Sequence, residues 1–359
     1  MYFAAAITYF PKLTYQRIKK LRDYFDNWKK AWEAELTELI RTGWDENVAA
    51  EFISWRDEFS LEKMATELTR EGITVVTLGA PGYPRLLSEI ADPPFVLFVR
   101  GALPPDEQPS VAIVGTRRCT NYGKQVTEQL ASELATQKVA LVSGLALGID
   151  GIAHDATLKA DGTTVAVLGS GVDHKNIYPV SHQQLAEQII GRGGAIVSEY
   201  PPGFEPTNYS FPARNRIIAG LSLGVLITEA PVESGALITA KCALDYNREV
   251  FAVPHPITSL SGEGGNNLIK MGAKLVTMAA DILDELQIKN IEHIITNNKI
   301  LPSTPTEAKL LEILSHEPQH IDLLIKLSGL DSPTVNSTLT MMEMKGKVRN
   351  VGAMQYVVK

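Results

Sequence analysis

From residue 111 onward, short apolar runs of strand length alternate with segments long enough to form helices. This alternation predicts a parallel sheet with helices on both faces, because each helix carries the chain back to the edge where the next strand begins. Ligands bind beyond the carboxyl ends of the strands in such sheets, so the residues after each run are the first candidates for a site. The runs are "VAIVG" (111–115), "VALVSG" (139–144), "TTVAVLG" (163–169), "AIVSEY" (195–200), "LGVLITEA" (223–230), "EVFAVP" (249–254) and "AKLVTM" (273–278).

The segments before and after this region predict the rest of the domain organisation. Residues 1–75 are dense in charge, contain all the tryptophans and space their apolar residues as helices do, which predicts a small helical domain. Residues 76–110 predict a connector with strands, so the α/β domain extends over 76–287. A polar stretch at 288–305 predicts a linker. Residues 306–359 contain three helix-like segments and then two short β runs, the pattern of a winged helix.

Charge and cysteine content exclude some classes of protein. The net charge of −7 argues against a protein that coats nucleic acid by bulk charge, so any phosphate must be bound locally. Cys119 and Cys242 are far apart and form no CxxC pair, which predicts neither a disulfide framework nor a thiolate metal site. No apolar run approaches the roughly 18 residues of a membrane span, and the N-terminus has no basic leader. We expect a cytoplasmic protein without a membrane segment.

The loop "GTRR" follows the first run and precedes a helix. Backbone N–H groups at the start of a helix favour an anion, and arginine adds bidentate contacts to phosphate. Gly115, Thr116, Arg117 and Arg118 are therefore candidate phosphate ligands. The alternative is that the arginines are solvated or form structural ion pairs.

The loop "SGLALGIDGIAH" begins with Ser143 and Gly144, and its glycines allow the backbone to approach a ligand, which suggests a second anion site. Asp150 and His154 lie one helical turn apart. With no further carboxylate or histidine cluster nearby, we interpret them as a structural cap and a hydrogen-bonded core histidine.

The loop "GSGVDHKNIYP" begins at Gly169 and adds Lys175 and Tyr178 to the same edge of the sheet. Lysine offers a charge to phosphate and tyrosine offers a face on which a base can stack. Packing of Tyr178 against Pro179 is an equally good interpretation.

The segment "YSFPARNR" places Phe211, Arg214 and Arg216 before an apolar helix. Basic groups interleaved with aromatic rings suit single-stranded nucleic acid, because the charges neutralise phosphates while the bases stack without sequence preference. Alternatively, Arg214 pairs with Glu199 or Glu229 and holds the edge of the sheet.

Glu229 and Glu233 suggest acid–base chemistry, but the chain has no Ser-His-Asp order, HExxH, Walker lysine loop or kinase set, so no nucleophile is positioned. Ser234 is interpreted as a helix N-cap.

In the winged-helix segment, the expected recognition helix "SPTVNSTLTMMEMKGK" carries lysines only at its end, whereas helices that read a DNA groove carry basic or amide side chains further forward. We favour a protein contact or weak DNA binding there, with the methionines in the core.

Together, "VAIVGTRRCTNYG", "VSGLALGIDGIAH", "VLGSGVDHKNIYP", "SEYPPGFEP", "FPARNRIIAGLS", "ITEAPVESGALITA" and "NNLIKMGA", in this order, resemble the DprA (Smf) family of DNA-processing proteins. The resemblance covers residues 111–285 closely. It implies an extended Rossmann-like fold, with a SAM-like helical N-terminus and a C-terminal winged helix. It also implies a homodimer that binds single-stranded DNA and loads RecA recombinase onto it during natural transformation, without catalysis and without a cofactor.

The resemblance also carries over individual residues. Segments around "GALITA" and "LIKMGA" correspond to the family's dimer and RecA-facing surface. This chain departs from the family where Pro254 is followed by His255, since the family has Pro-Gly there. The expected single-strand contacts are Gly115, Thr116, Arg117, Arg118, Ser143, Gly144, Gly169, Lys175, Tyr178, Phe211, Arg214 and Arg216.

Two other functions compete with this interpretation. Related Rossmann-like phosphoribohydrolases hydrolyse nucleoside monophosphates, but their PGGxGTxxE loop with its catalytic glutamate is replaced here by "ESGALITAKCAL". A protein-binding adaptor that uses the helical and winged domains is the third possibility.

Overall fold

The computed structural model describes residues 2–288, 304–314, 319–345, 347–352 and 354–358. The chain forms two compact units, residues 1–289 and 290–359. Within the described ranges, no helix combines the length and apolar character that crossing a membrane requires. Most of the predicted linker, residues 289–303, lies outside these ranges.

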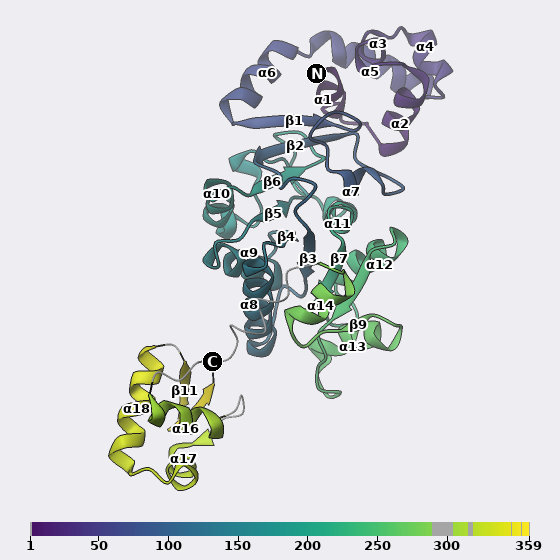
Figure 1. Ribbon diagram of the computed structural model, residues 1–359. Coiled ribbons are helices and arrows are strands. Elements are labelled where there is room, and N and C mark those ends of the chain that lie inside the picture. Colours follow the sequence, from purple (N-terminus) through teal and green to yellow (C-terminus); the bar gives the residue numbers. More distant parts are fainter. Residues whose placement is uncertain (1, 289–303, 315–318, 346, 353, 359) are drawn as a thin grey trace. The chain divides into compact units, whose positions relative to one another are not determined.

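A nine-stranded sheet runs through the first unit (Figure 1). All seven predicted runs form strands that pair in parallel, which confirms the parallel sheet. At the predicted connector, two strands pair antiparallel to each other, and the second of them pairs antiparallel to the edge of the parallel array. The spatial order is β1 (Ile73–Thr77), β2 (Val96–Gly101), β6 (Ala195–Ser198), β5 (Thr164–Val167), β4 (Ala140–Ser143), β3 (Ser110–Val114), β7 (Gly224–Ile227), β8 (Glu249–Ala252) and β9 (Lys274–Leu275).

The strand order reverses at β3. The chain builds outward from β3 through β4 and β5 to β6, then returns to place β7 on the other side of β3. In a doubly wound sheet, this reversal opens a crevice at the carboxyl ends of the two central strands. The loops after β3 and β7 therefore meet at the place where a ligand is expected.

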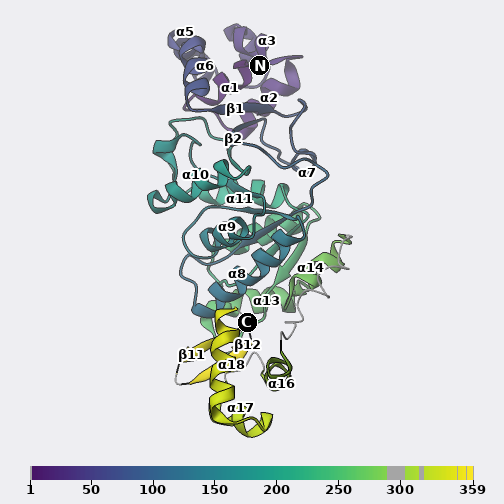
Figure 2. The same cartoon turned by 60° about the vertical axis from the view of Figure 1, so that its left-hand side comes forward.

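Helices cover both faces of the sheet. In β3, Ala112 and Val114 share a buried cluster with Ile217 and Ile218 of α11, whereas the intervening side chain points to the other face. Helices α8 and α9 lie side by side (Figure 1 and Figure 2). The elements are α7 (Arg85–Ser88), α8 (Asn121–Thr136), α9 (Ile149–Lys159), η1 (His174–Asn176), η2 (Val180–His182), α10 (Gln183–Gly191), α11 (Ser210–Gly220), α12 (Ala236–Asp245), η3 (Leu260–Gly262), α13 (Glu263–Lys270) and α14 (Ala279–Glu285).

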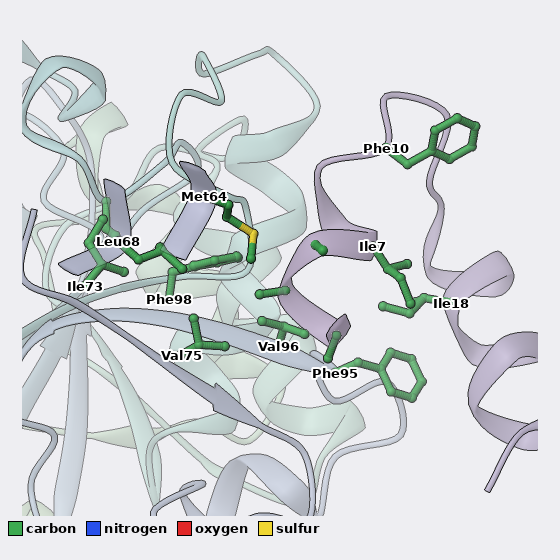
Figure 3. Packing of buried hydrophobic residues seen from close by; sticks show 14 of the residues in the cluster. Ile7, Phe10, Ile18, Met64, Leu68, Ile73, Val75, Phe95, Val96 and Phe98 are labelled. Carbon is green, nitrogen blue, oxygen red and sulfur yellow. The ribbon is translucent and has the colours of Figure 1, made fainter. Parts of the chain in front are cut away.

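The N-terminal helices and the first strands share one core. Ile7, Phe10 and Ile18 pack in the same buried cluster as Phe95 and Val96 at the start of β2 (Figure 3). The helical segment expected at residues 1–75 is helical as far as Arg70, and it belongs to the same compact unit as the sheet. Its helices are α1 (Tyr2–Thr8), α2 (Tyr15–Tyr24), α3 (Trp28–Glu33), α4 (Leu36–Arg41), α5 (Glu46–Glu58) and α6 (Leu61–Arg70).

The second unit has the predicted winged-helix pattern of three helices and a β hairpin. Its core contains Leu310, Leu324, Leu339 and Met342, while Met341 is half exposed, so only one of these two adjacent methionines is a core residue. The elements are α16 (Pro305–Ile313), β10 (Gln319–His320), α17 (Ile321–Ser328), α18 (Ser332–Met344), β11 (Val348–Gly352) and β12 (Gln355–Val358).

Two lysines of the second unit are bound internally. Glu307 of α16 is buried, and its carboxylate accepts from Lys345 Nζ at 2.7 Å and from Lys347 Nζ at 2.5 Å. These are the lysines at the end of the expected recognition helix. Their charge is largely matched inside the domain, which limits what they offer to a nucleic acid.

Candidate functional site

A cavity of about 530 Å³ lies at the crevice between β3 and β7. It is formed by the loops after β3, β4, β5 and β7 and by the first turns of α11. Most of the loops selected from the sequence therefore meet in one place. The lining residues include Gly115, Thr116, Arg117, Arg118, Asp150, Tyr178, Asn208, Phe211, Arg214, Asn215, Ser234 and Thr239.

The loop after β3 is held by Glu229, two residues beyond the end of β7. The Thr116 N–H donates to the Glu229 carbonyl oxygen at 2.7 Å, and the Thr120 N–H donates to Glu229 Oε2 at 2.9 Å. Gly123 packs against this carboxylate so closely that a Cβ would collide with it. The loop is thus fixed at both ends, which sets the direction of the side chains between them.

Arg117 and Arg118 project from this fixed loop and are exposed. Neither forms an ion pair with any residue that the structure describes, so the alternative of structural ion pairs does not apply to them. The guanidinium carbon of Arg117 lies 5.3 Å from the centre of the Phe211 ring. A cation held over an aromatic face keeps its charge while its direction is restricted.

Phe211 and Tyr178 form an aromatic wall beside the arginines. Their ring centroids are 5.6 Å apart with an interplanar angle of 49°. Tyr178 is 47% exposed, so packing against Pro179 leaves much of its ring open. The exposed surface of the cavity therefore combines cationic groups with ring faces.

The loop after β4 differs from expectation, because its amides already hold a carboxylate. Asp150, at the start of α9, accepts from the Gly144 N–H at 3.1 Å and also from the N–H groups of Ala146 and Gly115. Burial raises the pKa of Asp150, and the nearby Arg214 opposes that rise. The second anion site suggested by the sequence is thus occupied by the chain's own side chain. Asp150 has a structural role, as predicted, but it is not the cap of α9, whose N-cap residue is Gly148.

Ser143 and Gly144 also serve the framework. Ser143 is fully buried, and its Oγ donates to the Ile113 carbonyl at 2.6 Å inside the sheet. Gly144 lies against the Arg214 guanidinium, where a Cβ would collide. Gly169 backs Phe211 in a similar way, since a Cβ there would lie 3.2 Å from its ring.

Arg214 is buried under the cavity. Its Nη1 donates to the carbonyls of Gly144 and Val167, and its Nε donates to Asn215 Oδ1 at 3.0 Å. Burial lowers the pKa of Arg214 to about 10, which still leaves it charged at neutral pH. Arg214 therefore joins the ends of β4 and β5, and the suggested pairing with Glu199 or Glu229 was wrong.

Arg216 lies on another side of α11, away from this cavity. It binds Glu199 Oε2 at 2.5 Å and Asp92 Oδ2 at 3.5 Å, and it lines a different cavity. The predicted grouping of Arg216 with Arg117 is therefore not what the structure shows. Lys175, on η1, is exposed and does not line the crevice cavity.

Polar lining residues outside the predicted set include Asn208, Asn215 and Ser234. Asn215 belongs to the segment that was expected to precede the helix, but α11 begins at Ser210 and contains this segment. The Asn215 Nδ2 donates to the Gly235 carbonyl at 3.2 Å. Helix α12 begins at Ala236, two residues after Ser234, whose Oγ accepts from the Ala236 N–H at 3.3 Å. The hydroxyl thus binds the first turn, although it is not the N-cap residue.

His154 and His255 are held in the framework. Burial lowers the pKa of His154 to about 3, and its Nδ1 lies 2.7 Å from Thr164 Oγ1, so it is a core histidine as predicted. Its Nε2 is buried without a hydrogen-bond partner among the described residues, so the ring is only partly satisfied. In the loop after β8, where this chain has Pro-His in place of the family's Pro-Gly, the His255 N–H donates to Asn266 Oδ1 at 3.0 Å. The ring of Tyr122 packs edge-on against the His255 ring. Across the part of the chain that the structure describes, no group of three or more histidine, cysteine or carboxylate side chains is arranged to hold a metal ion.

Comparison with known proteins identifies the family. The model of DNA recombination-mediator protein A matches residues 63–287, and that of the DprA winged helix domain matches residues 297–353. The chain is 35% identical to Protein Smf of Synechocystis sp., across 94% of this chain and 94% of that protein. The X-ray structure of DNA processing protein A from Streptococcus pneumoniae aligns with a TM-score of 0.66 and 35% identity, covering 79% of this chain and 96% of its own. That of the Helicobacter pylori protein aligns at 0.52 with 33% identity, covering 60% and 95%. The chain therefore belongs to the DNA recombination-mediator protein A family, which is the DprA (Smf) family that its motifs resemble.

Proposed function

We propose that this protein binds single-stranded DNA in the crevice cavity, without strong sequence preference, and loads RecA recombinase onto the strand. The observation that supports this most is the pairing of two exposed, unpaired arginines with an open aromatic wall. The Helicobacter pylori relative is described with a single-stranded DNA binding mode of its own. Binding, rather than catalysis, is the proposed activity.

Arg117 and Arg118 would bind the phosphates of the strand. An arginine that makes no internal ion pair can donate two hydrogen bonds to one phosphate. Contacts of this kind carry no sequence information. Because they release counterions, the affinity falls as salt concentration rises.

Tyr178 and Phe211 would stack the bases. Every base has a face that can stack on an aromatic ring, so the contact tolerates any sequence. Bases in a duplex are already stacked and paired, so their faces are not available to these rings. The site therefore favours single strands over duplexes.

The proposed homodimer and RecA contact belong to the side of the first unit formed by α12 and α13. Leu244 of α12 and Met271, directly after α13, are exposed there, although both are apolar. Exposed apolar side chains that gather on one face mark protein interaction surfaces. Sedimentation of the wild type and of Met271→Glu tests the dimer, and capture of purified RecA by both proteins tests the second contact.

The first experiment measures fluorescence anisotropy of labelled single-stranded and duplex oligonucleotides across a salt series. The wild type should prefer single strands, and Arg117→Ala should weaken binding about tenfold, in the range of a lost charge-assisted hydrogen bond. Arg41→Ala is the matched control, because Arg41 is exposed on α4, far from the lining residues.

Three outcomes separate the alternatives. Absence of single-strand binding at low salt would reject the proposal and lead to assays of nucleoside monophosphate hydrolysis. An adaptor would keep its protein contacts in Arg117→Ala and show no single-strand preference. Binding that is equally strong in Arg117→Ala and Arg41→Ala would place the strand at a different surface.

A further inference from the structure

A second cavity, of about 650 Å³, lies in the first unit on the other side of α11. It is formed by α1, α2, the start of β2 and the loop after β6. Neither the sequence motifs nor the site described above gives this cavity a role. Its chemistry differs from that of the crevice, because it contains no exposed arginine.

Aromatic rings dominate the second cavity. Tyr200 and Phe204 of the loop after β6 are stacked, with centroids 4.3 Å apart and an interplanar angle of 11°. Tyr15 of α2 and Phe95 also line the cavity, with their ring centroids 5.3 Å apart. Stacked and parallel rings of this kind offer flat faces, which a planar ring system fits better than an aliphatic chain does.

The loop that carries Tyr200 and Phe204 is anchored. The Gly203 N–H donates to Asp173 Oδ1 at 2.8 Å, and the Gly171 N–H donates to the Phe204 carbonyl at 2.9 Å. Both partners lie in the loop after β5, which also carries Tyr178 of the crevice cavity. The ring faces are therefore held in place before any ligand arrives, which lowers the entropy cost of binding.

The charged residues that line the second cavity are Glu199 and Arg216, and they pair with each other at 2.5 Å. Asp92, which does not line the cavity, binds the same guanidinium at 3.5 Å, so Arg216 is shared by two carboxylates. The Glu199 side chain is 19% exposed and lines the cavity. A carboxylate accepts hydrogen bonds, and the one lining arginine is already bound by carboxylates, so these groups suit the amino group of a base better than a nucleotide's phosphate.

The two cavities are neighbours across α11. Pro212 and Asn215 line the crevice cavity, whereas Ala213 and Arg216 line the second one. A helix is about 10 Å across, which a short oligonucleotide can span. Tyr209, immediately before α11, is 87% exposed and offers a further ring at the start of the helix that separates them.

We propose that the second cavity holds a base of the same single strand that the crevice binds, stacked on the rings of Tyr200 and Phe204 with its amino group toward Glu199. This inference rests on the proposed function. The crevice binds the strand through phosphates and stacking, the strand passes Tyr209, and the second cavity takes a base whose phosphates stay outside. Long strands then bind more tightly than short ones, and only long strands distinguish bases that carry an amino group from thymine.

The test compares labelled oligonucleotides of about six and about twenty nucleotides, lengths at the lower end of and above a usual single-strand site. The variants are Tyr200→Ala, which removes one ring, and Phe204→Leu, which keeps apolar volume but removes the flat face. Tyr24→Ala is the matched control, since Tyr24 is a half-exposed tyrosine that lines neither cavity. Oligonucleotides of deoxycytidine and thymidine are used at each length.

We expect Tyr200→Ala and Phe204→Leu to weaken binding of the long strands about tenfold, in line with loss of one stacked base. Binding of the short strand should stay unchanged in the same preparations, which also shows that the variants are folded. The wild type should prefer deoxycytidine only in the long strand.

Other results overturn the inference. If the variants bind long strands as the Tyr24→Ala control does, the second cavity holds no base. If the short strand loses affinity equally, the rings act on the crevice and not at a separate subsite. If the wild type binds neither strand, the proposed function itself has failed, a result that differs from both of the others.

Discussion

The loop after β3 and helix α11 each carry two arginines within three residues, and the structure uses the two pairs in opposite ways. Arg117 and Arg118 are exposed and form no ion pair with the described residues. Arg214 is buried among carbonyl oxygens, and Arg216 is held by two carboxylates. Both segments carry two arginines, so burial and partners decide whether an arginine is available to a ligand or bound by the framework.

The difference follows from the elements that carry the residues. A loop beyond the end of a strand has no neighbour above it, so its long side chains reach solvent. Helix α11 packs on the sheet, and its residues 214 and 216 must find partners inside. If DNA binds in the crevice as proposed, the positive charge that it meets is supplied mainly by the loop, with Arg214 as a fixed charge below.

The largest effect on the free energy of unfolding should come from Arg214→Ala, which tests the claim that the arginines of α11 are structural. The substitution leaves Asp150 and two carbonyl groups without their buried cation, so it should lower the free energy of unfolding by about 3–5 kcal/mol. Urea unfolding followed by tryptophan fluorescence measures this, because every tryptophan lies in the first unit.

Arg41→Ala is the control for that measurement and should change the free energy of unfolding by less than about 0.5 kcal/mol. Equal stability of the two variants would mean that Arg214 is not a structural residue. In that case Arg214 would be as available to DNA as Arg117, and the contrast between loop and helix would be lost.

The fold could be predicted from the sequence further than the site. Parallel strands that are buried on both faces are nearly continuous apolar runs, so "VAIVG" and its counterparts identified all seven strands. The winged helix also followed from its pattern. What the pattern did not show is that Phe95 and Val96 share a core with the N-terminal helices, because that contact joins segments far apart in the chain.

The sequence predicted which loops form the site. Its errors concern the directions in which individual side chains point. Arg214 and Arg216 are two residues apart, so on a helix they point about 200° from each other. That spacing could have separated them once α11 was expected there. No spacing in the sequence indicated that Asp150 would accept hydrogen bonds from the amides of the loop after β4, because this contact depends on how the loop folds back.

An intermediate effect should appear in the pH dependence of stability, through His154. Its folded pKa of about 3 lies below the ordinary 6.5, because burial disfavours the charged ring, followed by the effects of His182 and Arg214. The unfolded chain then binds more protons, so stability is full above about pH 6.5 and is lost as the pH falls toward 3. Lowering the pH from about 7 to about 5 should cost about 2 kcal/mol through this group.

His154→Gln separates this contribution from other titrating groups. Urea unfolding at both pH values should show that the variant loses about 2 kcal/mol less than the wild type on acidification. The amide keeps a polar partner for Thr164 but does not titrate. The same pH dependence in both proteins would show that His154 is protonated in the folded state, contrary to its complete burial.

The smallest effect should come from Lys175→Ala, which tests whether the cationic surface extends beyond the exposed arginines of the loop after β3. Arg117→Ala should reduce the slope of log affinity against log salt by about 0.7, the value for one phosphate contact of a single strand. Lys175 is exposed but lies outside the lining of the crevice cavity, so its removal should change the slope by less than about half of that amount. Anisotropy in a salt series measures both variants under the same conditions. An equal reduction in Lys175→Ala would show that the strand also runs over η1, and the cationic surface would then extend from the loop after β3 to the loop after β5.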